Sequence, residues 1–274
     1  MSCLYVVGTP IGNLDDFSPR AQETLKSVDF IAAEDTRVTL KLLNRFGIKK
    51  PMISYYEHNK RERGEIICKR ILAGESCAIV TDAGMPCISD PGEELVKQCA
   101  ELNIPVYAVP GPSAAVSALA ISGLTTGRFT FEGFLSMNKK SRREHLESLI
   151  DEQRTMIFYE APHKASSTLA DMAQTFGYDR KISIVRELTK IHEEVIRTTL
   201  GEAAEAYADG GLKGELVFVI DGAQPKITQE ITLDDAVNRA QKLMESGLSC
   251  SESAKRAAAE SGFKKADIYR RLLD

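Results

Sequence analysis

Residue types that hold metals or form disulfides are scarce in this sequence. It contains no tryptophan, four histidines and six cysteines among 274 residues, the cysteines being Cys3, Cys68, Cys77, Cys87, Cys99 and Cys250. No two cysteines form a C-x-x-C pair, and no histidine stands at a spacing typical of a zinc site. We therefore expect no metal site, and we expect the cysteines to remain reduced thiols.

Long apolar runs are also absent. The N-terminal run Leu4–Val7 ends at a glycine, and no stretch approaches the ~20 apolar residues that a membrane-spanning helix needs. A net charge of −4 excludes a uniformly basic surface that coats nucleic acid, although local basic patches are compatible with it. These features predict a soluble, cytoplasmic protein with no membrane contact.

Several short catalytic motifs are incomplete. The turn Gly8–Asn13 lacks the Gly-Lys-Ser/Thr of a phosphate-binding P-loop and the third glycine of a dinucleotide fingerprint. Ser113 lacks the glycine two residues later that a hydrolase nucleophile needs, and His192 has no second histidine with which to bind zinc. The sequence thus argues against nucleoside triphosphate or NAD binding, serine hydrolysis and zinc hydrolysis.

The first third of the chain alternates short apolar runs with longer amphipathic stretches. Helical spacing occurs between the runs, for example at Ala21, Leu25 and Val28. The runs that we interpret as buried strands are Leu4–Val7, Phe30–Ala33, Met52–Tyr56, Cys77–Thr81 and Pro105–Val109. This alternation predicts an α/β fold, with a parallel sheet in an N-terminal domain of residues 1–112.

After Pro110 the pattern becomes richer in strands and predicts a mixed α/β domain over residues 113–224. Its expected strands are Phe129–Phe134, Thr155–Glu160, Lys181–Leu188, Val195–Leu200 and Glu215–Ile220. Its expected helices are Ser113–Ser122, Arg142–Ile150, His163–Phe176 and Gly201–Ala208.

Residues 225–274 predict a small helical module. Thr232 and Asp235 resemble a capping box, and two further helices are expected at Ser251–Ala259 and Lys264–Leu273. Two interpretations stay open here. The three helices could form a helix-turn-helix-like unit, or they could be a helical tail packed on the second domain.

Two loops rich in glycine and proline follow predicted strands. Asp82–Gly92 comes after Thr81, and Pro110–Ala114 opens a helix after Val109. Open α/β sheets bind ligands at the carboxyl ends of their strands, and helix N-termini favour negative charge. The loops therefore predict a ligand site, the alternative being two tight turns with a structural role only.

The residues at these positions resemble a known family. The segments that carry the resemblance are Leu4–Leu14, Ala33–Arg37, Thr81–Pro86, Ser89–Gly92, Pro110–Ala114, Phe131–Leu135 and Tyr159–His163. Together they are similar to the bacterial small-subunit ribosomal RNA methyltransferases of type I, within the tetrapyrrole methylase (class III) superfamily. The resemblance covers about residues 4 to 221 in matching order, so no single motif has to carry it.

The resemblance implies transfer of a methyl group from S-adenosylmethionine to the ribose 2′-hydroxyl of a cytidine in the decoding region of 16S rRNA. It also implies a cleft between two α/β domains, a homodimer, and a substrate within the 30S subunit. A sulfonium donor brings its own electrophile, which agrees with a sequence that lacks metal and nucleophile motifs. The positions that match cofactor contacts are Asp82, Ala83, Gly84, Ile88, Ser113, Ala114, Tyr159, Leu188, Gly214 and Glu215. Met85 and Cys87 depart from the Thr and Gly that the family pattern has there.

Recognition of RNA must come from local charge and from the acceptor loop. The resemblance places Pro10 and Asn13 in the loop that faces the acceptor. Arg37 could hold a carboxylate or a phosphate. The basic segment comprises Lys139, Lys140, Arg142 and Arg143, which we interpret as RNA contacts, the alternative being a solvated helix face.

A weakly nucleophilic hydroxyl would benefit from a general base, and strand-end carboxylates are the candidates. We favour Asp35, with Glu132 as the second catalytic candidate; Glu34, Glu160 and His163 are further possibilities, and an Asp35–Arg37 pair that only caps a helix is the alternative. Two other functions stay open. One is a methylase of the same superfamily acting on a tetrapyrrole or a protein, and the other is a non-enzymatic RNA-binding assembly factor.

Overall fold

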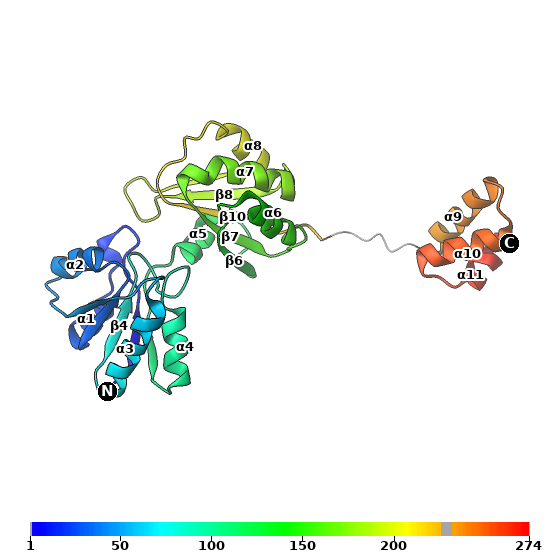
Figure 1. Cartoon of the computed structure of the whole chain (residues 1–274). Coiled ribbons are helices and arrows are strands. Elements are labelled where there is room, and N and C mark those ends of the chain that lie inside the picture. The colour runs from blue at the N-terminus through cyan, green and yellow to red at the C-terminus, as the bar shows by residue number, and fades with distance from the viewer. Residues whose placement is uncertain (1, 226–231, 274) are drawn as a thin grey trace. The chain divides into compact units, whose positions relative to one another are not determined.

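A computed structural model describes residues 2–225 and 232–273 (Figure 1). The chain divides between Ala223 and Gln224 into two compact units. Within the described ranges, no helix is long and apolar enough to cross a membrane. The same residues contain no group of three or more His, Cys, Asp or Glu side chains that could hold a metal ion.

The first part of the larger unit is built on a parallel sheet, as the alternating pattern predicts. Its strands are β1 (Leu4–Val7), β2 (Phe30–Ala33), β3 (Met52–Ser54), β4 (Cys77–Val80) and β5 (Val106–Val109). They lie in the order β3-β2-β4-β1-β5, and every neighbouring pair is parallel. The carboxyl ends of all five strands therefore meet at one edge of the sheet.

Helices cover both faces of this sheet. They are α1 (Pro19–Ser27), α2 (Thr36–Arg45), α3 (Lys60–Leu72) and α4 (Glu93–Glu101), with a short 3-10 turn η1 (Leu14–Asp16) before α1. Because side chains alternate along a strand, Phe30 and Ala32 of β2 join the core under α3 and α4, whereas Ile31 and Ala33 join the core under α1 and α2. β2 and β4 are buried at all four residues, and burial on both faces explains why these two strands are apolar throughout.

The second sheet is mixed, which confirms the expectation for this part of the chain. Its strands are β6 (Phe129–Phe134), β7 (Thr155–Glu160), β8 (Lys181–Arg186), β9 (Glu194–Thr199) and β10 (Leu216–Ile220). The order is β6-β7-β10-β8-β9, where β6 and β7 are parallel and the other pairs are antiparallel.

The two faces of the second sheet have different partners (Figure 1). One face packs against α6 (Lys139–Ser148), α7 (Pro162–Phe176) and α8 (Leu200–Ala206). The other face packs against α5 (Ala114–Ser122), whose Ala118 meets Ile157 and Val219. Ile11, from the loop after β1, belongs to this same core. The binding edge of the parallel sheet is thereby joined to the second sheet.

The smaller unit consists of α9 (Leu233–Glu245), α10 (Cys250–Ser261) and α11 (Lys265–Leu273). Its core contains Ala236, Ala240, Ala254, Ala257 and Ile268. Thr232 and Asp235 form the expected capping box. The prediction of a small three-helix module is confirmed, and its own core shows that it is a compact unit.

Two element boundaries differ from expectation because of asparagine side chains. β3 ends at Ser54 and not at Tyr56, since the Asn59 side chain accepts the Tyr56 N–H at 2.8 Å and donates to the Ser54 carbonyl at 3.2 Å. α6 begins at Lys139 and not at Arg142, since the Asn138 side chain caps its first turn. The basic segment is therefore part of a helix. The domain limits 1–112, 113–224 and 225–274 remain our proposal.

Candidate functional site

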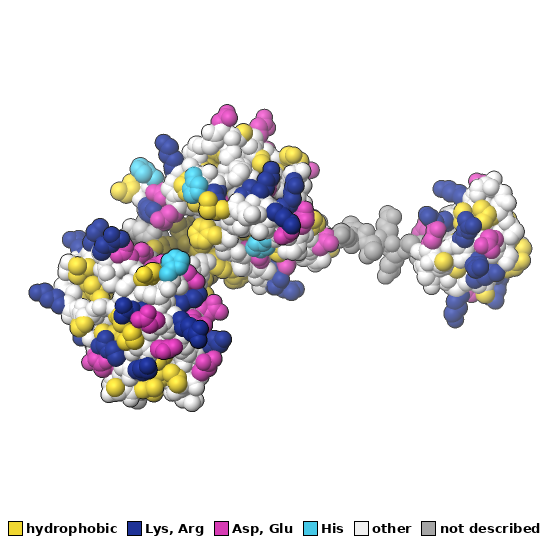
Figure 2. All heavy atoms as spheres, viewed as in Figure 1, with side chains coloured by type: hydrophobic (Ala, Val, Ile, Leu, Met, Phe, Trp, Pro, Cys, Tyr) yellow, Lys and Arg dark blue, Asp and Glu magenta, His cyan; other side chains and the backbone are white. Residues whose placement is uncertain are grey.

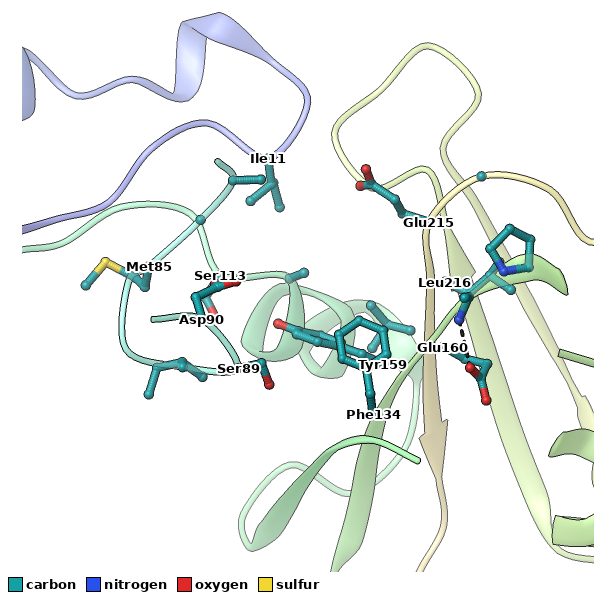
Figure 3. A pocket seen from close by; sticks show the side chains of 18 residues that line it. Ile11, Met85, Ser89, Asp90, Ser113, Phe134, Tyr159, Glu160, Glu215 and Leu216 are labelled. Carbon is teal, nitrogen blue, oxygen red and sulfur yellow. Dashed lines mark hydrogen bonds between the residues drawn. The ribbon is translucent and has the colours of Figure 1, made fainter. Parts of the chain in front are cut away.

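A hollow of about 350 Å³ opens where the carboxyl edge of the parallel sheet meets the second sheet (Figure 3). Apolar side chains gather in the recess between the two sheets (Figure 2). The lining residues are Ile11, Ala83, Gly84, Met85, Ile88, Ser89, Asp90, Ser113, Ala114, Phe134, Tyr159, Glu160, Ala161, Pro162, Gly214, Glu215, Leu216 and Val217. We call the hollow lined by these residues the first hollow. Its size is that of a small-molecule pocket, for which ~300–1,000 Å³ is usual.

The loop after β4 forms one wall of the first hollow. Gly84 has a φ of +88°, and its backbone exchanges two hydrogen bonds with Thr9, at 2.9 and 3.1 Å. Cys87 and Ser89 also have left-handed backbones, with φ of 72° and 63°. Left-handed backbone is unfavourable for residues with a Cβ. The resemblance predicts glycine at position 87, and a left-handed φ is a conformation that glycine adopts without strain.

The start of α5 forms the floor. Ser113 is the N-cap, but its side chain makes no capping hydrogen bond. The turn before it passes so close to the end of β1 that a Cβ on Gly8 would lie 2.6 Å from the Gly111 Cα. Only glycine fits such an approach. The hydroxyl of Tyr159 accepts a hydrogen bond from the Ala115 N–H at 3.1 Å, which ties α5 to β7.

The second sheet supplies the opposite wall. The Tyr159 ring contacts the rings of Phe131 and Phe134, with centroids 4.9 and 5.4 Å away. Glu160 is 3% exposed; its carboxylate pairs with Lys164 at 2.8 Å and accepts the Thr168 hydroxyl proton at 2.5 Å. These contacts assign Glu160 a structural role.

Eight of the ten expected cofactor positions line this hollow: Ala83, Gly84, Ile88, Ser113, Ala114, Tyr159, Gly214 and Glu215. Asp82 and Leu188 are not among the lining residues. Leu188 packs in the core beside Ile11, and Asp82 accepts a hydrogen bond from the Asp35 N–H at 3.2 Å. The sequence reasoning missed Ile11, Phe134 and Asp90. All three stand inside segments that carry the family resemblance, and this was the only signal for them.

The structure does not support Asp35 as a general base. Asp35 is the N-cap of α2 and accepts the Arg37 N–H at 2.8 Å. The Arg37 guanidinium also bonds its carboxylate, and these hydrogen bonds lower the Asp35 pKa to about 2. A carboxylate of such low pKa is a poor proton acceptor at neutral pH. The helix-capping alternative is the one that the geometry favours.

Glu132 is also placed away from the first hollow's lining. Its carboxylate lies 3.1 Å from the His145 ring nitrogen of α6, and its side chain is 15% exposed. This contact joins β6 to α6 and gives Glu132 a structural partner. The expectation of a catalytic Glu132 is not supported.

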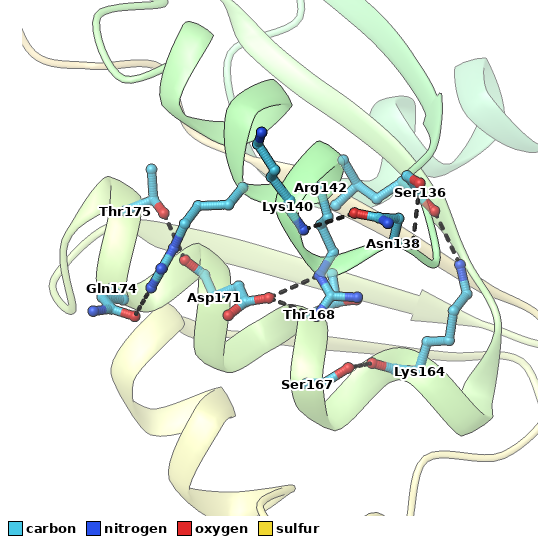
Figure 4. Close-up of polar contacts among 12 residues, drawn as sticks. Ser136, Asn138, Lys140, Arg142, Lys164, Ser167, Thr168, Asp171, Gln174 and Thr175 are labelled. Atoms are coloured by element: carbon cyan, nitrogen blue, oxygen red, sulfur yellow. Dashed lines mark hydrogen bonds and ion pairs between the residues drawn. The ribbon is translucent and has the colours of Figure 1, made fainter.

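The four basic residues of the expected RNA segment divide into two groups, and Figure 4 shows one of them, Arg142, with its guanidinium at Asp171. Arg142 is 7% exposed, and its guanidinium pairs with Asp171 of α7 at 2.7 Å. It therefore cannot reach a nucleic acid, which corrects our expectation. Lys139, Lys140 and Arg143 line a hollow on the outer face of α6.

The remaining predicted substrate contacts lie at the same edge of the parallel sheet. Pro10 and Asn13 are in the loop after β1, where the Asn13 side chain accepts the Asp15 N–H at 3.1 Å. The side chain of Arg37 is 87% exposed and is bound to Asp35. These three positions stay predictions.

Comparison with known proteins adds the family. The family described as Tetrapyrrole (Corrin/Porphyrin) Methylases matches residues 3–204. The Ribosomal RNA small subunit methyltransferase I of Synechocystis sp. is 45% identical over 274 residues, which cover 100% of this chain and 98% of that protein. The protein of the same name from Thermotoga maritima is 46% identical over 224 residues, which cover 82% of this chain and 100% of that protein.

A solved structure shares the fold. Uroporphyrin-III C-methyl transferase from Thermus thermophilus, complexed with S-adenyl homocysteine, superposes with a TM-score of 0.57 at 16% identity, covering 80% of this chain and 97% of that one. At this identity the likeness concerns the architecture alone. The two-sheet α/β fold, the family match and the full-length relatives agree, and the chain therefore belongs to the tetrapyrrole methylase family, among the ribosomal RNA small subunit methyltransferases I.

Proposed function

We propose that this protein transfers a methyl group from S-adenosylmethionine to the ribose 2′-hydroxyl of a cytidine in 16S rRNA. The observation that carries the proposal is the first hollow, whose lining includes eight of the ten expected cofactor positions. It agrees with the 45% identity of the chain to a ribosomal RNA methyltransferase. The proposal includes a substrate within the 30S subunit, a homodimer, and a cytoplasmic location, because ribosomal RNA is found there.

The walls of the first hollow fit S-adenosylmethionine. Its apolar side chains, such as Ile11 and Leu216, suit an adenine ring, and the Gly84 backbone can approach a ligand closely. The Phe134 and Tyr159 rings suit a sulfonium cation. The uncapped start of α5 at Ser113 suits the carboxylate of the methionine part. When bound, the cofactor supplies a sulfonium methyl group that an oxygen nucleophile can attack.

The residues of the chain then have to bind the cofactor, orient it toward the oxygen nucleophile and shield both from water. The hydrogen bonds between Thr9 and Gly84 fix the β4 loop to the end of β1, and the bond between Tyr159 and Ala115 fixes the second sheet to the start of α5. Alignment of this kind supplies a large part of the rate in methyl transfer without a metal. On the outer face of α6, Lys139, Lys140 and Arg143 share a hollow with Glu144 and Glu147, and we propose that the three basic side chains contact phosphates of the RNA.

Mapping of 2′-O-methyl groups in 16S rRNA tests the proposal. We expect one cytidine to lose its methyl group when the gene is deleted and to regain it on complementation. Purified protein should then methylate 30S subunits from the deletion strain. Binding of S-adenosylmethionine without any change in rRNA methylation would favour a tetrapyrrole or protein substrate. Absence of S-adenosylmethionine binding in calorimetry would favour a non-enzymatic assembly factor.

A further inference from the structure

The smaller unit contains a helix pair to which the proposed function gives no role. Its last two helices, α10 and α11, are joined by a short turn over residues 262–264 (Figure 1). Gly262 ends α10 in the left-handed conformation, with a φ of +77°, and Phe263 packs against the core of the unit. A short turn with glycine between two helices is typical of helix-turn-helix units, which present their second helix to nucleic acid. The structure therefore favours the helix-turn-helix-like interpretation of this module.

Positive charge is concentrated in this unit, above all on its last helix. Residues 232–273 contain eight Lys or Arg and six Asp or Glu, whereas the whole chain has a net charge of −4. Residues 264–273 contain four Lys or Arg and one Asp. All eight basic residues of the unit are exposed, and Figure 2 shows Lys and Arg side chains over the face of the unit that is in view. Such a local excess of positive charge in an acidic chain favours an anionic partner.

Acidic neighbours neutralise only part of this charge. Among the residues that the structure describes, Lys264 and Arg270 form no ion pair. Lys265 donates a hydrogen bond to the neutral hydroxyl of Ser251 at 2.9 Å and so keeps its charge uncompensated. These three cations of residues 264–273 are therefore available to an external anion. The ion pairs within the unit are Arg239–Glu260, Arg256–Glu252 and Arg271–Asp234.

The exposed face of α11 places an aromatic ring between two of these cations. Ile268 is fully buried and defines the inward side of the helix. Residues four apart share a face of a helix, so Lys265 and Tyr269 lie in one row. Arg270 follows Tyr269 on the side opposite Ile268, and the Tyr269 side chain is 37% exposed. Cations bind phosphates and unstacked bases pack on aromatic rings, so this combination fits RNA.

This face fits RNA better than it fits duplex DNA. Recognition of base edges in a DNA groove uses side chains such as Arg, Asn and Gln on the exposed face of the second helix. The residues of α11 that face away from Ile268 are Ala266, Tyr269, Arg270 and Leu273, and only Arg270 is of this kind. A face that binds phosphates and stacks on a base, without a set of groups that read a duplex, matches an RNA with unpaired bases.

The length of a relative indicates that the unit is an addition to the methylase fold. The Thermotoga maritima relative is covered completely by a match of 224 residues. The larger unit of this chain, Met1–Ala223, has about that length. About 224 residues therefore suffice for a member of the family. A role in binding, and not in the chemistry of the first hollow, fits such an addition.

We propose that Lys264, Lys265, Tyr269 and Arg270 form a second RNA-binding surface, which we call the α11 surface. Its three cations contact phosphates of the ribosomal RNA substrate, and the Tyr269 ring stacks on an unpaired base other than the acceptor cytidine. This inference rests on the proposed function and adds to it a contact that lies outside the larger unit. The α11 surface thereby contributes affinity for the RNA and takes no part in binding S-adenosylmethionine.

Removal of charge is the first test. The full-length double variant Lys265→Ala/Arg270→Ala and wild type are titrated with 16S rRNA and with 30S subunits that lack the methyl group, at several salt concentrations. Loss of two phosphate contacts should reduce the steepness of log affinity against log salt by about 1.4–1.8. The affinity for S-adenosylmethionine, measured by calorimetry, should stay at the wild-type value. Alanine is a good helix former, so α11 should be retained.

A matched control separates the α11 surface from the net charge of the unit. The double variant Arg239→Ala/Lys242→Ala removes the same charge from α9, where Arg239 is already paired with Glu260. It should keep the wild-type salt dependence. Equal salt dependence of the two double variants would overturn the α11 surface, because the charge would then act without a local contact.

Removal of the ring is the second test. Tyr269→Ala should weaken binding of 16S rRNA about 5- to 150-fold through the loss of one stacked base. Tyr269→Phe retains the ring and should bind as wild type does. Equal affinities of the two variants would overturn the stacking contact. If circular dichroism shows that Tyr269→Ala loses helix, the charge variants decide, because Lys265 and Arg270 are exposed.

The same titrations separate the partners and the proposed function. If Lys265→Ala/Arg270→Ala binds naked 16S rRNA as wild type does but binds 30S subunits less tightly, the partner is a ribosomal protein and the proposal is overturned. A loss of affinity for duplex DNA alone would also overturn it. If wild type methylates 30S subunits while the variants keep the wild-type salt dependence, this inference fails alone. If wild type binds RNA through the α11 surface but methylates no rRNA, the proposed function fails and the RNA-binding surface stands.

Discussion

Replacement of Arg142 should destabilise the protein, and it should do so without a direct effect on RNA binding. The Arg142 and Asp171 side chains are only 8% and 14% exposed, and the Nε atom and one terminal nitrogen of the guanidinium each lie 2.7 Å from the same carboxylate oxygen. Arg142→Ala leaves the Asp171 carboxylate buried without its partner. Breaking a buried ion pair in this way costs about 3–5 kcal/mol of unfolding free energy.

Thermal unfolding followed by circular dichroism measures this loss. About 1 kcal/mol corresponds to ~2–4 °C in a domain of this size, so the Tm should fall by roughly 6–20 °C. Arg143→Ala is the matched control: its guanidinium, on the exposed side of α6, makes a 3.3 Å hydrogen bond to Gln174, so the change should cost less than about 1 kcal/mol.

A double variant separates the ion pair from simple packing. Replacing Arg142 by Met and Asp171 by Leu removes both charges, and such exchanges are often neutral or stabilising. The Tm of the double variant should therefore lie above that of Arg142→Ala. If Arg142→Ala and Arg143→Ala unfold at the same temperature, the assignment of Arg142 as a buried structural residue is refuted.

Three further changes test the site. Gly84→Val puts a β-branched residue at a φ of +88° with its Cβ 3.2 Å from Ile11, so calorimetry should show lost S-adenosylmethionine binding. The control Gly74→Val, at a φ of +109° with nothing within 4 Å, should bind S-adenosylmethionine normally. Asp35→Asn retains a good N-cap. Because the Asp35 pKa is about 2, the single-turnover rate should not show the ~10²–10⁴-fold loss expected for a general base. A loss of that size would restore Asp35 as the base. Alanine at Lys139, Lys140 and Arg143 together should lower the slope of RNA affinity against salt by ~0.7–0.9 for each phosphate contact removed, with cofactor affinity unchanged; a wild-type slope would exclude this face of α6.

The sequence predicted the architecture well because the apolar periodicity is local. β2 is apolar in all four residues, and such a run between amphipathic helices indicates a strand buried on both faces. The lining of the first hollow followed from motifs at strand ends, where parallel strands place their loops together. Resemblance to a family supplied the chemistry of the ligand.

The individual polar side chains were harder to predict because their partners lie far away in the chain. Arg142 pairs with Asp171, which lies 29 residues later in the chain. The sequence alone cannot distinguish such an arginine from its exposed neighbours. For Asp35 the catalytic role stays an untested prediction, although its contacts favour helix capping. Its capping hydrogen bond is local, but the bound guanidinium that removes its basicity depends on a side-chain conformation.

The left-handed residues of the β4 loop have a consequence for affinity. Conformations such as those of Cys87 and Ser89 cost of order 1–3 kcal/mol each, and they persist only where the surrounding structure enforces them. Here the hydrogen bonds between Thr9 and Gly84 anchor the loop to the end of β1. The free-energy cost of these conformations therefore arises during folding and not when a ligand binds. A ligand that enters the first hollow finds a preorganised wall and does not lose affinity to loop ordering, so amide hydrogen exchange in this loop should be slow before ligand is added.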